Sequence, residues 1–408
     1  MSHALPPHFF RHQYGRLVAA LTRRFGVQHL AAVEDSAQQA LVVALETWGR
    51  ASLPDDPAAW LYRVAVNEFL GEARQRSRRG RILERYTSDE VTEVAEPYLE
   101  GELGDDVLRL LFVCCEADIP VESQLVFALR TLCGFGVREI SLRLFTSEAN
   151  VYKRLGRARE RLRSLPRDLD LQPQSFGERL PAVRTVLYLL FTEGYLSGHA
   201  EVAIRRELCE EALRLGEQLA KHPLGADSET AALVALMHLH LARLGARQDA
   251  SGGLLLLEEQ ARAAWDPTHI QLGLRWLARS AEGDSFTRYH AEAGIAAEHC
   301  LAPSFAQTNW RRIVECYELL EGLSPSPVHR LNRALALAEV DGPQAALQLL
   351  EAEAPPGWLA GSYLWLAALA DLFRRAGDAE QAERYKREAL DLAPNAAIRA
   401  LLVRRLSL

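Results

Sequence analysis

Apolar side chains recur at helical spacing along most of the chain, and no stretch alternates strictly between apolar and polar residues. Phe9 to Phe25 and Val33 to Trp48 show this spacing, the second with a clean stripe at every third or fourth position. A third helix is predicted from Pro57 to about Arg79, because Asp56 can cap it and proline suits the first helical position. Ala and Leu dominate the composition and β-branched residues are sparse, so we predict an all-α protein.

The segment from residue 122 to residue 163 predicts three short helices joined by tight turns. We place them at Ser123–Leu132, Val137–Phe145 and Glu148–Arg163, with Ser147 as the cap of the third. Apolar residues of this third helix lie on one side, and most of its other residues are basic. A basic amphipathic helix after a tight turn is typical of a helix-turn-helix whose last helix enters a major groove. The alternative is a solvated amphipathic helix in an all-helical protein.

Charge is sorted into blocks along the first part of the chain. The net charge of −7 argues weakly against nucleic-acid binding, but residues 1–167 hold 23 basic and 22 acidic side chains. The end of the third helix and the segment after it carry a basic run: Arg74, Arg76, Arg78, Arg79, Arg81 and Arg85. Residues 87–106 then carry eight acids and no base. Such blocks indicate a DNA-facing surface followed by a solvated linker.

Several classes of protein are disfavoured by what the sequence lacks. The six cysteines include no CxxC pair and no zinc-ligand spacing with histidine, so we expect buried reduced thiols, no metal and no cofactor. No apolar run reaches membrane-spanning length and no signal peptide is seen, which predicts a cytoplasmic protein that does not contact a membrane. No nucleophile–base pair or glycine-rich phosphate loop stands out, so we do not expect an enzyme.

A series of short motifs follows in a fixed order. Glu34-Asp35 opens the second helix and Gln38 follows; residues 56–61 read Asp-Pro-Ala-Ala-Trp-Leu, and residues 64–67 read Val-Ala-Val-Asn. The arginine run, the acidic linker and the helix-turn-helix come next. Each motif is weak alone, but this ordered set resembles regions 2 and 4 of the extracytoplasmic-function (ECF) sigma factors of RNA polymerase. The resemblance covers residues 9–167.

The resemblance implies three sets of site residues. The acidic helix would bind core polymerase through Glu34, Asp35 and Gln38. The third helix would contact the −10 element through Asn67, Arg74, Arg76, Arg78 and Arg79. A recognition helix offers its N-terminal part to base edges, so we assign Asn150, Lys153 and Arg154 to −35 bases and Arg157, Arg159 and Arg161 to the DNA backbone.

Some residues keep two interpretations at this stage. Trp60 could stack on an unpaired base or pack in the core, and the burial habit of tryptophan favours the core. Asn67 either touches DNA or is a solvated helix residue. Glu34 and Asp35 also suit the first turn of any helix. The pair Cys114-Cys115 lies in an apolar stretch and is expected to be core.

The second half of the chain resembles one group of these sigma factors, which carries a helical extension with tetratricopeptide-like repeats. The stretches that carry this likeness are 180–195, 249–265 and 326–339. Independently, Ala334 and Ala346 recur as Ala370 and Ala382, an offset of 36 residues. Residues 363–396 form the better repeat and residues 328–351 a poorer one. Stacked helix pairs of this kind form a concave binding surface.

Between residues 200 and 300 the pattern predicts helix pairs without a clear period, at Ala203–Leu219, Thr230–Leu244, Leu254–Trp265 and Ile270–Ala281. A polar set in this part could be a turn followed by an amphipathic helix, or could instead dock the sigma part or a ligand: Asp249, Gly252, Gln260, Arg262 and Trp265. The two uses cannot be separated from the sequence.

We therefore expect five segments: region 2 at 9–80, an acidic linker at 81–109, region 4 at 110–167, a helical extension at 168–300 and tetratricopeptide-like repeats at 301–408. The predicted function is a sigma factor that directs promoter-specific initiation, with the C-terminal helical domain modulating its activity. The implied partners are core RNA polymerase, promoter DNA and a protein or ligand on the repeats. The alternative is a stand-alone helix-turn-helix regulator with a protein-interaction domain.

Overall fold

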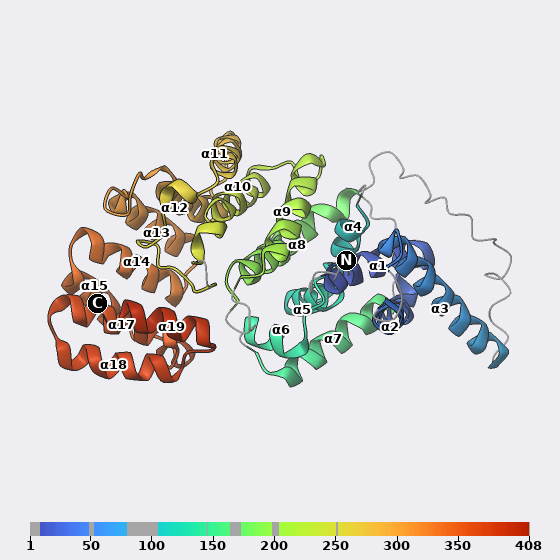
Figure 1. Ribbon diagram of the computed structural model, residues 1–408. Helices are drawn as coiled ribbons and strands as arrows, with labels where there is room; N and C mark the ends of the chain where they lie inside the picture. The colour runs from blue at the N-terminus through green and yellow to red at the C-terminus, as the bar shows by residue number, and fades with distance from the viewer. Residues whose placement is uncertain are drawn as a thin grey trace. The chain divides into compact units, whose positions relative to one another are not determined.

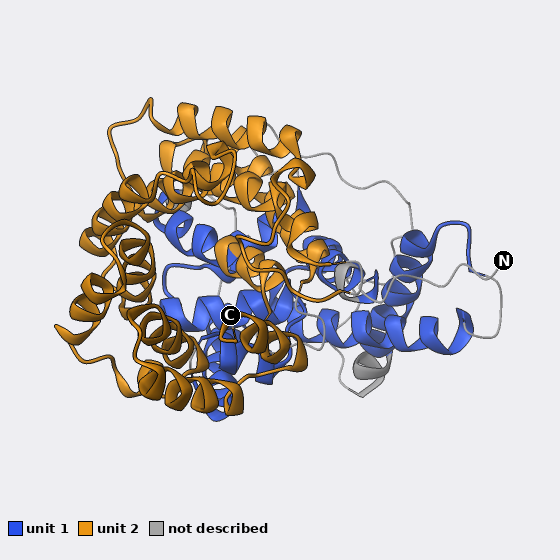
Figure 2. Ribbon diagram, turned by 60° about the vertical axis from the view of Figure 1, so that its left-hand side comes forward, with its two compact units in different colours: residues 1–186 blue, residues 187–408 orange. Residues whose placement is uncertain are grey.

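The computed structural model describes residues 9–48, 53–79, 105–144, 146–163, 173–197, 204–249 and 252–407. These residues form α-helices and short 3-10 helices (Figure 1), with no strand in the described ranges beyond a single bridge between Gln248 and Leu254. The predicted all-α fold is confirmed. The chain divides into two compact units, residues 1–186 and residues 187–408 (Figure 2). Each helix of the described part is too short or too polar to cross a bilayer.

Unit 1 is built from helices whose bounds follow the hydrophobic pattern. They are α1 (Phe9–Phe25), η1 (Val27–His29), α2 (Leu30–Trp48), α3 (Pro57–Arg79), α4 (Asp106–Cys114), α5 (Val121–Thr131), α6 (Val137–Arg143), α7 (Glu148–Arg163) and the first part of α8 (Pro173–Tyr195). Helix α2 begins three residues earlier than predicted. The short 3-10 turn η1 leads directly into it after Gly26, whose φ of 91° suits glycine.

Two helix starts in unit 1 have the caps that the sequence predicts. The Asp56 carboxylate accepts a hydrogen bond from the Ala59 N–H at 3.0 Å, and the Ser147 hydroxyl accepts one from the Asn150 N–H at 3.2 Å. Asp105, at the edge of the predicted linker, caps α4 by accepting from Val107 and Leu108. Residues 80–104, which hold most of that linker, lie outside the described residues.

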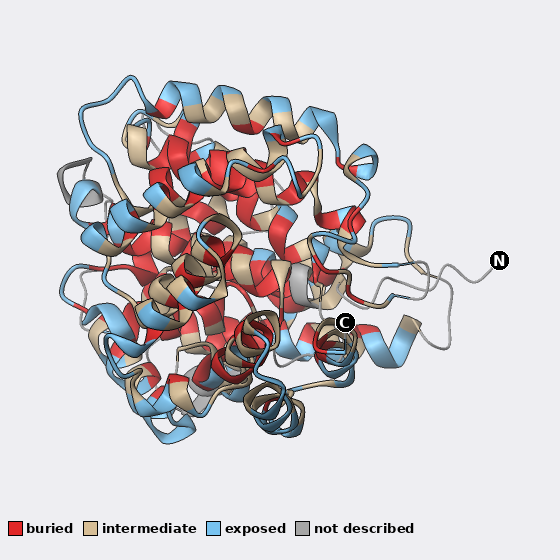
Figure 3. Ribbon diagram, turned by 90° about the vertical axis from the view of Figure 1, so that its left-hand side faces the viewer, coloured by how far each residue is buried: buried red, intermediate tan, exposed pale blue. Residues whose placement is uncertain are grey.

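Unit 2 consists of helices that pack against their neighbours in sequence. They are α9 (Arg206–Lys221), α10 (Ser228–Ala242), η2 (Leu244–Arg247), η3 (Arg262–Ala264), α11 (Pro267–Ser280), α12 (Arg288–Leu301), α13 (Trp310–Leu323), α14 (Pro327–Val340), α15 (Pro343–Glu351), α16 (Gly357–Ala360), α17 (Tyr363–Ala376), α18 (Ala379–Asp391) and α19 (Ala396–Arg405). Contacts join α10 to α11, α13 to α14 and α17 to α18. Buried residues line the helix faces that meet, and the outer faces are exposed (Figure 3).

The predicted offset of 36 residues is visible in the helices themselves. Helix α17 begins 36 residues after α14, and α18 begins 36 residues after α15. Ala334, Ala346 and Ala370 are buried, at 0%, 0% and 1% exposure, so small residues allow close helix contacts there, whereas Ala382 is half-buried. The helix pair α14–α15 therefore recurs as the pair α17–α18.

The helix predicted at Leu254–Trp265 is wrong. This segment is irregular and contains only the 3-10 turn η3. Gly252 has φ of 84° in a turn that the Asp249 carboxylate stabilises by accepting from the Gly253 N–H at 2.9 Å. Further on, the Glu259 side chain accepts from the Leu256 N–H and the Gln260 amide donates to the Leu255 carbonyl. Side chains thus satisfy backbone groups that a helix would have paired internally.

Candidate nucleic-acid and polymerase interface

Helix α7 has one buried side and one exposed side. Its apolar stripe is buried by α5 and α6, as predicted: Val151, Leu155, Ala158 and Leu162 are at most 5% exposed. The other side exposes Asn150, Lys153 and Arg157, while Arg154 is half-buried. Tyr152 lies among them with 63% of its surface exposed. This outer side can therefore face a duplex without breaking any packing.

The last two arginines predicted to hold DNA are engaged within the chain. Arg159 forms an ion pair with Glu34 of α2, with 2.8 Å between Nη2 and Oε2. Arg161 forms one with Asp118, in the turn between α4 and α5. The Arg161 pair is exposed, with 41% and 61% of the two side chains accessible, whereas the Glu34 side chain is 5% exposed. The two contacts therefore differ in how much solvent screens them.

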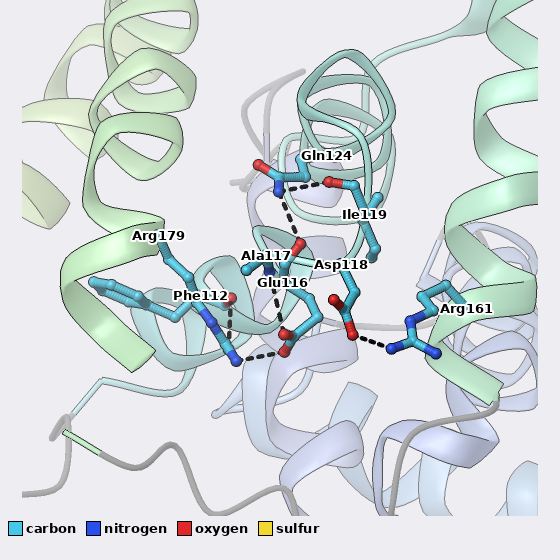
Figure 4. Close-up of polar contacts among 8 residues, drawn as sticks. All are labelled: Phe112, Glu116, Ala117, Asp118, Ile119, Gln124, Arg161 and Arg179. Atoms are coloured by element: carbon cyan, nitrogen blue, oxygen red, sulfur yellow. Dashed lines mark hydrogen bonds and ion pairs between the residues drawn. The ribbon is translucent and has the colours of Figure 1, made fainter. Parts of the chain in front are cut away.

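The turn between α4 and α5, which contacts Arg161 of α7, is a compact polar arrangement (Figure 4). The Gln124 amide donates to the carbonyls of Glu116 and Ile119, both at 2.8 Å, and fixes the turn between α4 and α5. On one side of it Asp118 meets Arg161, and on the other Glu116 meets Arg179 of α8. Arg179 is 4% exposed and also donates to the Phe112 carbonyl at 3.2 Å. Unit 1 therefore uses a residue that lies beyond the predicted end of region 4.

Glu34 is buried, although the sequence assigned it to a polymerase contact. The Thr131 hydroxyl donates to its Oε1 at 2.7 Å, and Arg159 holds its Oε2. Tyr14 of α1 lies beside it, and burial followed by the Glu34 charge raises the pKa of the Tyr14 hydroxyl well above its usual value. We call Tyr14, Glu34, Thr131 and Arg159 the Glu34 cluster.

Beside this cluster the backbones approach closely. A Cβ atom placed on Gly15 of α1 would lie 2.2 Å from the carbonyl oxygen of Leu132, directly after α5. Only glycine allows that approach. The Glu34 cluster and Gly15 therefore join α1 and α2 to α5 and α7 through both polar and backbone contacts.

The other residues predicted in α2 and α3 lie at the surface. Asp35 and Gln38 are exposed on α2, so the predicted polymerase set is split between a buried and an exposed part. Asn67 and Arg74 are exposed on α3. The side chains of Arg76, Arg78 and Arg79 lie outside the described residues, although their backbone belongs to α3.

Trp60 packs within an aromatic group. Its ring centre lies 5.2 Å from that of Trp48, which in turn stacks on Phe10 at 5.9 Å. Trp60 is half-buried, so it packs against other aromatic rings at the edge of the core and is not fully buried in it.

In unit 2, the predicted docking residues do not share one role. Asp249 and Gly252 form the turn already described. Gln260, Arg262 and Trp265 instead lie together in a cluster with residues that the sequence did not single out. The Gln260 amide oxygen accepts from Arg243 at 3.3 Å, and the guanidinium groups of Arg243 and Arg262 lie 5.3 and 4.1 Å from the Trp265 ring centre.

Several residues of these sites were missed because their partners are far away in sequence. Thr131 and Asp118 carry no motif, and Arg243 sits at the end of an otherwise apolar helix. Tyr152 could have been found, because its position in the helical period places it outside the apolar stripe.

Comparison with known families assigns three parts of the chain. Residues 10–79 match sigma-70 region 2, residues 114–162 match sigma-70 region 4, and residues 179–281 match DUF6596, a family of unknown function. The chain belongs to the sigma-70 family. It is also 35% identical over 387 residues to the uncharacterized protein R00370 of Rhizobium meliloti (strain 1021), which covers 93% of this chain and 90% of the relative. No solved structure matches it significantly.

The family matches assign the helices of unit 1 to sigma-70 regions and imply their partners. Sigma-70 regions 2 and 4 imply core RNA polymerase and promoter DNA as partners. Helices α1, α2 and α3 belong to region 2, whereas α5, α6 and α7 belong to region 4. The Glu34 cluster is therefore a contact between region 2 and region 4 within one unit. In unit 2, the part that matches the family of unknown function contains Arg243, Gln260, Arg262 and Trp265.

Proposed function

We propose that this sigma factor is of the extracytoplasmic-function kind and directs core RNA polymerase to a specific promoter in the cytoplasm. The observation that carries the proposal is the exposed side of α7, which presents Asn150, Lys153 and Arg157 opposite a fully buried apolar stripe within the region 4 match. The chain itself would carry out no covalent step. Its product is an opened promoter bound to polymerase.

On DNA, the first part of α7 would read bases and the later part would hold phosphates. Asn150, Lys153 and Arg154 are the proposed base contacts, and Arg157 is the proposed backbone contact that is already exposed. Neutralising a phosphate releases counterions, so Arg157→Ala should lower the salt dependence of −35 binding by about one unit of slope. An unchanged slope would remove Arg157 from the interface. In region 2, the proposed contacts to the −10 strand are Asn67 and Arg74, which are exposed on α3, together with Arg76, Arg78 and Arg79.

On polymerase, the exposed Asp35 and Gln38 of α2 would make the first contact. Glu34 can join them only after Thr131 and Arg159 release it, because its carboxylate is buried by both. Polymerase binding would then separate region 2 from region 4 and free Arg159 for DNA. A single event would expose both functional surfaces.

The test is co-elution of the full chain with core polymerase. Asp35→Lys should abolish co-elution, because it reverses an exposed charge at the proposed contact. Glu46→Lys is the matched control, since it makes the same change at an exposed position near the other end of α2. Loss of binding in both variants, or in neither, would remove the contact from this helix. Glu34 is unsuited to charge reversal, because a positive charge at its buried position would damage the fold.

We further propose that unit 2 modulates initiation and is required for it. Promoter opening by Trp265→Ala is compared with opening by Trp358→Ala, which alters a half-exposed tryptophan elsewhere in the unit. The first variant should open promoters poorly and the second normally. Faster opening by Trp265→Ala would instead make unit 2 an inhibitor.

A further inference from the structure

Unit 2 holds a group of arginines that have no carboxylate partner among the residues that the structure describes. Arg243 donates from Nε to the Gln260 amide oxygen, Arg247 donates to the Tyr195 carbonyl, and Arg262 donates to the His299 carbonyl. All three acceptors are neutral. No acid of the described residues forms an ion pair with any of these arginines.

This is an exception within unit 2. Arg205, which is 8% exposed, pairs with the buried Glu193 at 3.5 Å. Arg375 pairs with Glu339 at 2.6 Å, and Arg333 pairs with Glu321 at 3.0 Å. Partly buried arginines in this unit are thus usually given an acid, because removing an unpaired charge from water is unfavourable.

The unpaired arginines converge on one place. Arg243 and Arg262 both lie over the Trp265 ring, at 5.3 and 4.1 Å from its centre. Arg247 lies 3.8 Å from the Tyr195 ring centre, and that ring is 4.6 Å from the ring of His240. We call this group the Trp265 cluster. Its members are Tyr195, His240, Arg243, Arg247, Gln260, Arg262, Trp265 and His299.

The same cluster contains buried polar atoms that have no hydrogen-bond partner within the described part of the chain. They are the Tyr195 hydroxyl, Nδ1 of His240 and His299, Nη2 of Arg262 and Nε1 of Trp265. The indole and guanidinium nitrogens can only donate, and the phenol can donate as well. Trp265 is 4% exposed, so its N–H cannot be satisfied by bulk water. Buried donors of this kind are ordinarily paired.

The electrostatic environment of the histidines agrees with this picture. Burial, then the charges of Arg243 and Arg247 and then His299, lowers the pKa of His240 to about 3. Burial, then Arg243 and Arg262, lowers the pKa of His299 to about 3. No acid contributes to either shift. The cluster therefore carries positive charge on arginine alone, beside neutral imidazoles.

We propose that the Trp265 cluster is a binding site for a small anionic molecule that carries a carboxylate or phosphate group. Arg243 and Arg262 would supply the charge, and the Trp265 N–H would supply a further donor. A guanidinium fork matches either group with two parallel hydrogen bonds. The burial of Trp265 favours a small molecule over a macromolecule, since only a small group can reach the indole N–H.

Such a ligand would join separate parts of unit 2. Tyr195 ends α8, Arg243 follows α10, Trp265 follows η3 and His299 lies near the end of α12. The anion would thus hold the irregular segment between Leu254 and Trp265 against three helices. This gives unit 2 a means of responding to the concentration of a metabolite, which goes beyond the sigma activity proposed above.

The experiment measures saturable binding to the full chain at constant ionic strength. The probes are inorganic phosphate and citrate, exchanged against chloride, and the readouts are calorimetry and the melting temperature of unit 2. We expect saturable binding of at least one probe, which also identifies the preferred group. Arg262→Gln should weaken it about tenfold or more, because it removes a charged donor.

Two further variants keep the test decisive. Trp265→Phe retains a ring but removes the N–H, and it should weaken binding even if Arg262→Gln fails to fold. Arg311→Gln removes an exposed arginine outside the cluster and should bind as the unaltered chain does. Lack of saturable binding of both probes would overturn the proposal. Equal binding by Trp265→Phe and the unaltered chain would overturn it too.

Discussion

The two units have buried polar centres of opposite character. In unit 1 the Glu34 cluster surrounds one buried carboxylate with donors from Thr131 and Arg159. In unit 2 the Trp265 cluster gathers three guanidinium groups that find only neutral acceptors. The first centre is complete within the chain and acts as a contact between regions 2 and 4. The second contains no acidic side chain among the described residues, which is why we propose a ligand for it.

Acidification should produce the largest difference in stability between the two units, because it should destabilise unit 2 through its buried histidines. The pKa of His240 and of His299 is lowered to about 3 in the fold, and the pKa of His238, His290 and His329 is lowered as well. The unfolded chain takes up protons from about pH 6.5 downward while the folded chain does not. The free energy of unfolding should thus fall as pH falls from about 6.5 towards 3, by roughly 4 kcal/mol at pH 5 for His240 and His299 together.

Thermal melting of the full chain between pH 7.5 and pH 5 checks this, with the two transitions followed separately. Phosphate or citrate at constant ionic strength should reduce the loss, because a bound anion favours protonated imidazole. A unit 2 transition that does not move with pH would contradict the neutral state of these histidines.

The backbone contact of unit 1 should be the next most sensitive feature. Gly15→Ala places a Cβ 2.2 Å from the Leu132 carbonyl, so α1 must move, and we expect unit 1 to lose about 2–3 kcal/mol. The matched control is Gly71→Ala in α3, where the added Cβ meets nothing within 4 Å. It should be neutral or stabilising by up to about 1 kcal/mol, since alanine favours helix. Urea denaturation distinguishes the two, and equal effects would remove the close approach as their cause.

Removing the charge of Glu34 should have a somewhat smaller effect. Glu34→Gln keeps the shape but weakens the bonds to Thr131 and Arg159, which should cost unit 1 about 2 kcal/mol. Asp35→Asn, one residue later and exposed, should leave the free energy of unfolding unchanged. A double-mutant cycle of Glu34→Gln with Arg159→Gln measures the coupling. Strictly additive effects would show that the pair contributes nothing.

The exposed pair of α7 should matter least. Asp118→Asn removes one partner of Arg161, but both side chains are largely exposed. Surface ion pairs are worth about 0–1 kcal/mol, so the loss should lie within that range and vanish at high salt. A loss as large as that of Glu34→Gln, measured by the same denaturation, would mean that burial does not explain the difference.

The sequence predicted local structure well and distant contacts poorly. The apolar stripe of α7 and the caps Asp56 and Ser147 are encoded within a few residues, and the structure confirms them. Glu34 lies 97 residues from Thr131 and 125 from Arg159, so no local pattern could indicate its burial.

The helix prediction for the segment Leu254–Trp265 was wrong for a related reason. Its composition suits a helix, but side chains such as Glu259 and Gln260 satisfy the backbone, and the Trp265 ring packs against Arg243 from outside the segment as well as Arg262 within it. Tertiary contacts outweighed local propensity there. The residues that complete the Trp265 cluster come from four separate helices or turns, and only the folded chain brings them together.

The buried thiols of unit 1 provide a way to measure how often its helices separate. Cys114 and Cys133 are 0% and 8% exposed, and the charge of Glu34 contributes to the raised pKa of Cys114, after burial and the neighbouring Cys115. A thiol reagent can reach Cys114 only when the helices around it part. The rate of its labelling therefore reports how often these helices separate, and core polymerase should raise that rate if its binding opens the contact between regions 2 and 4.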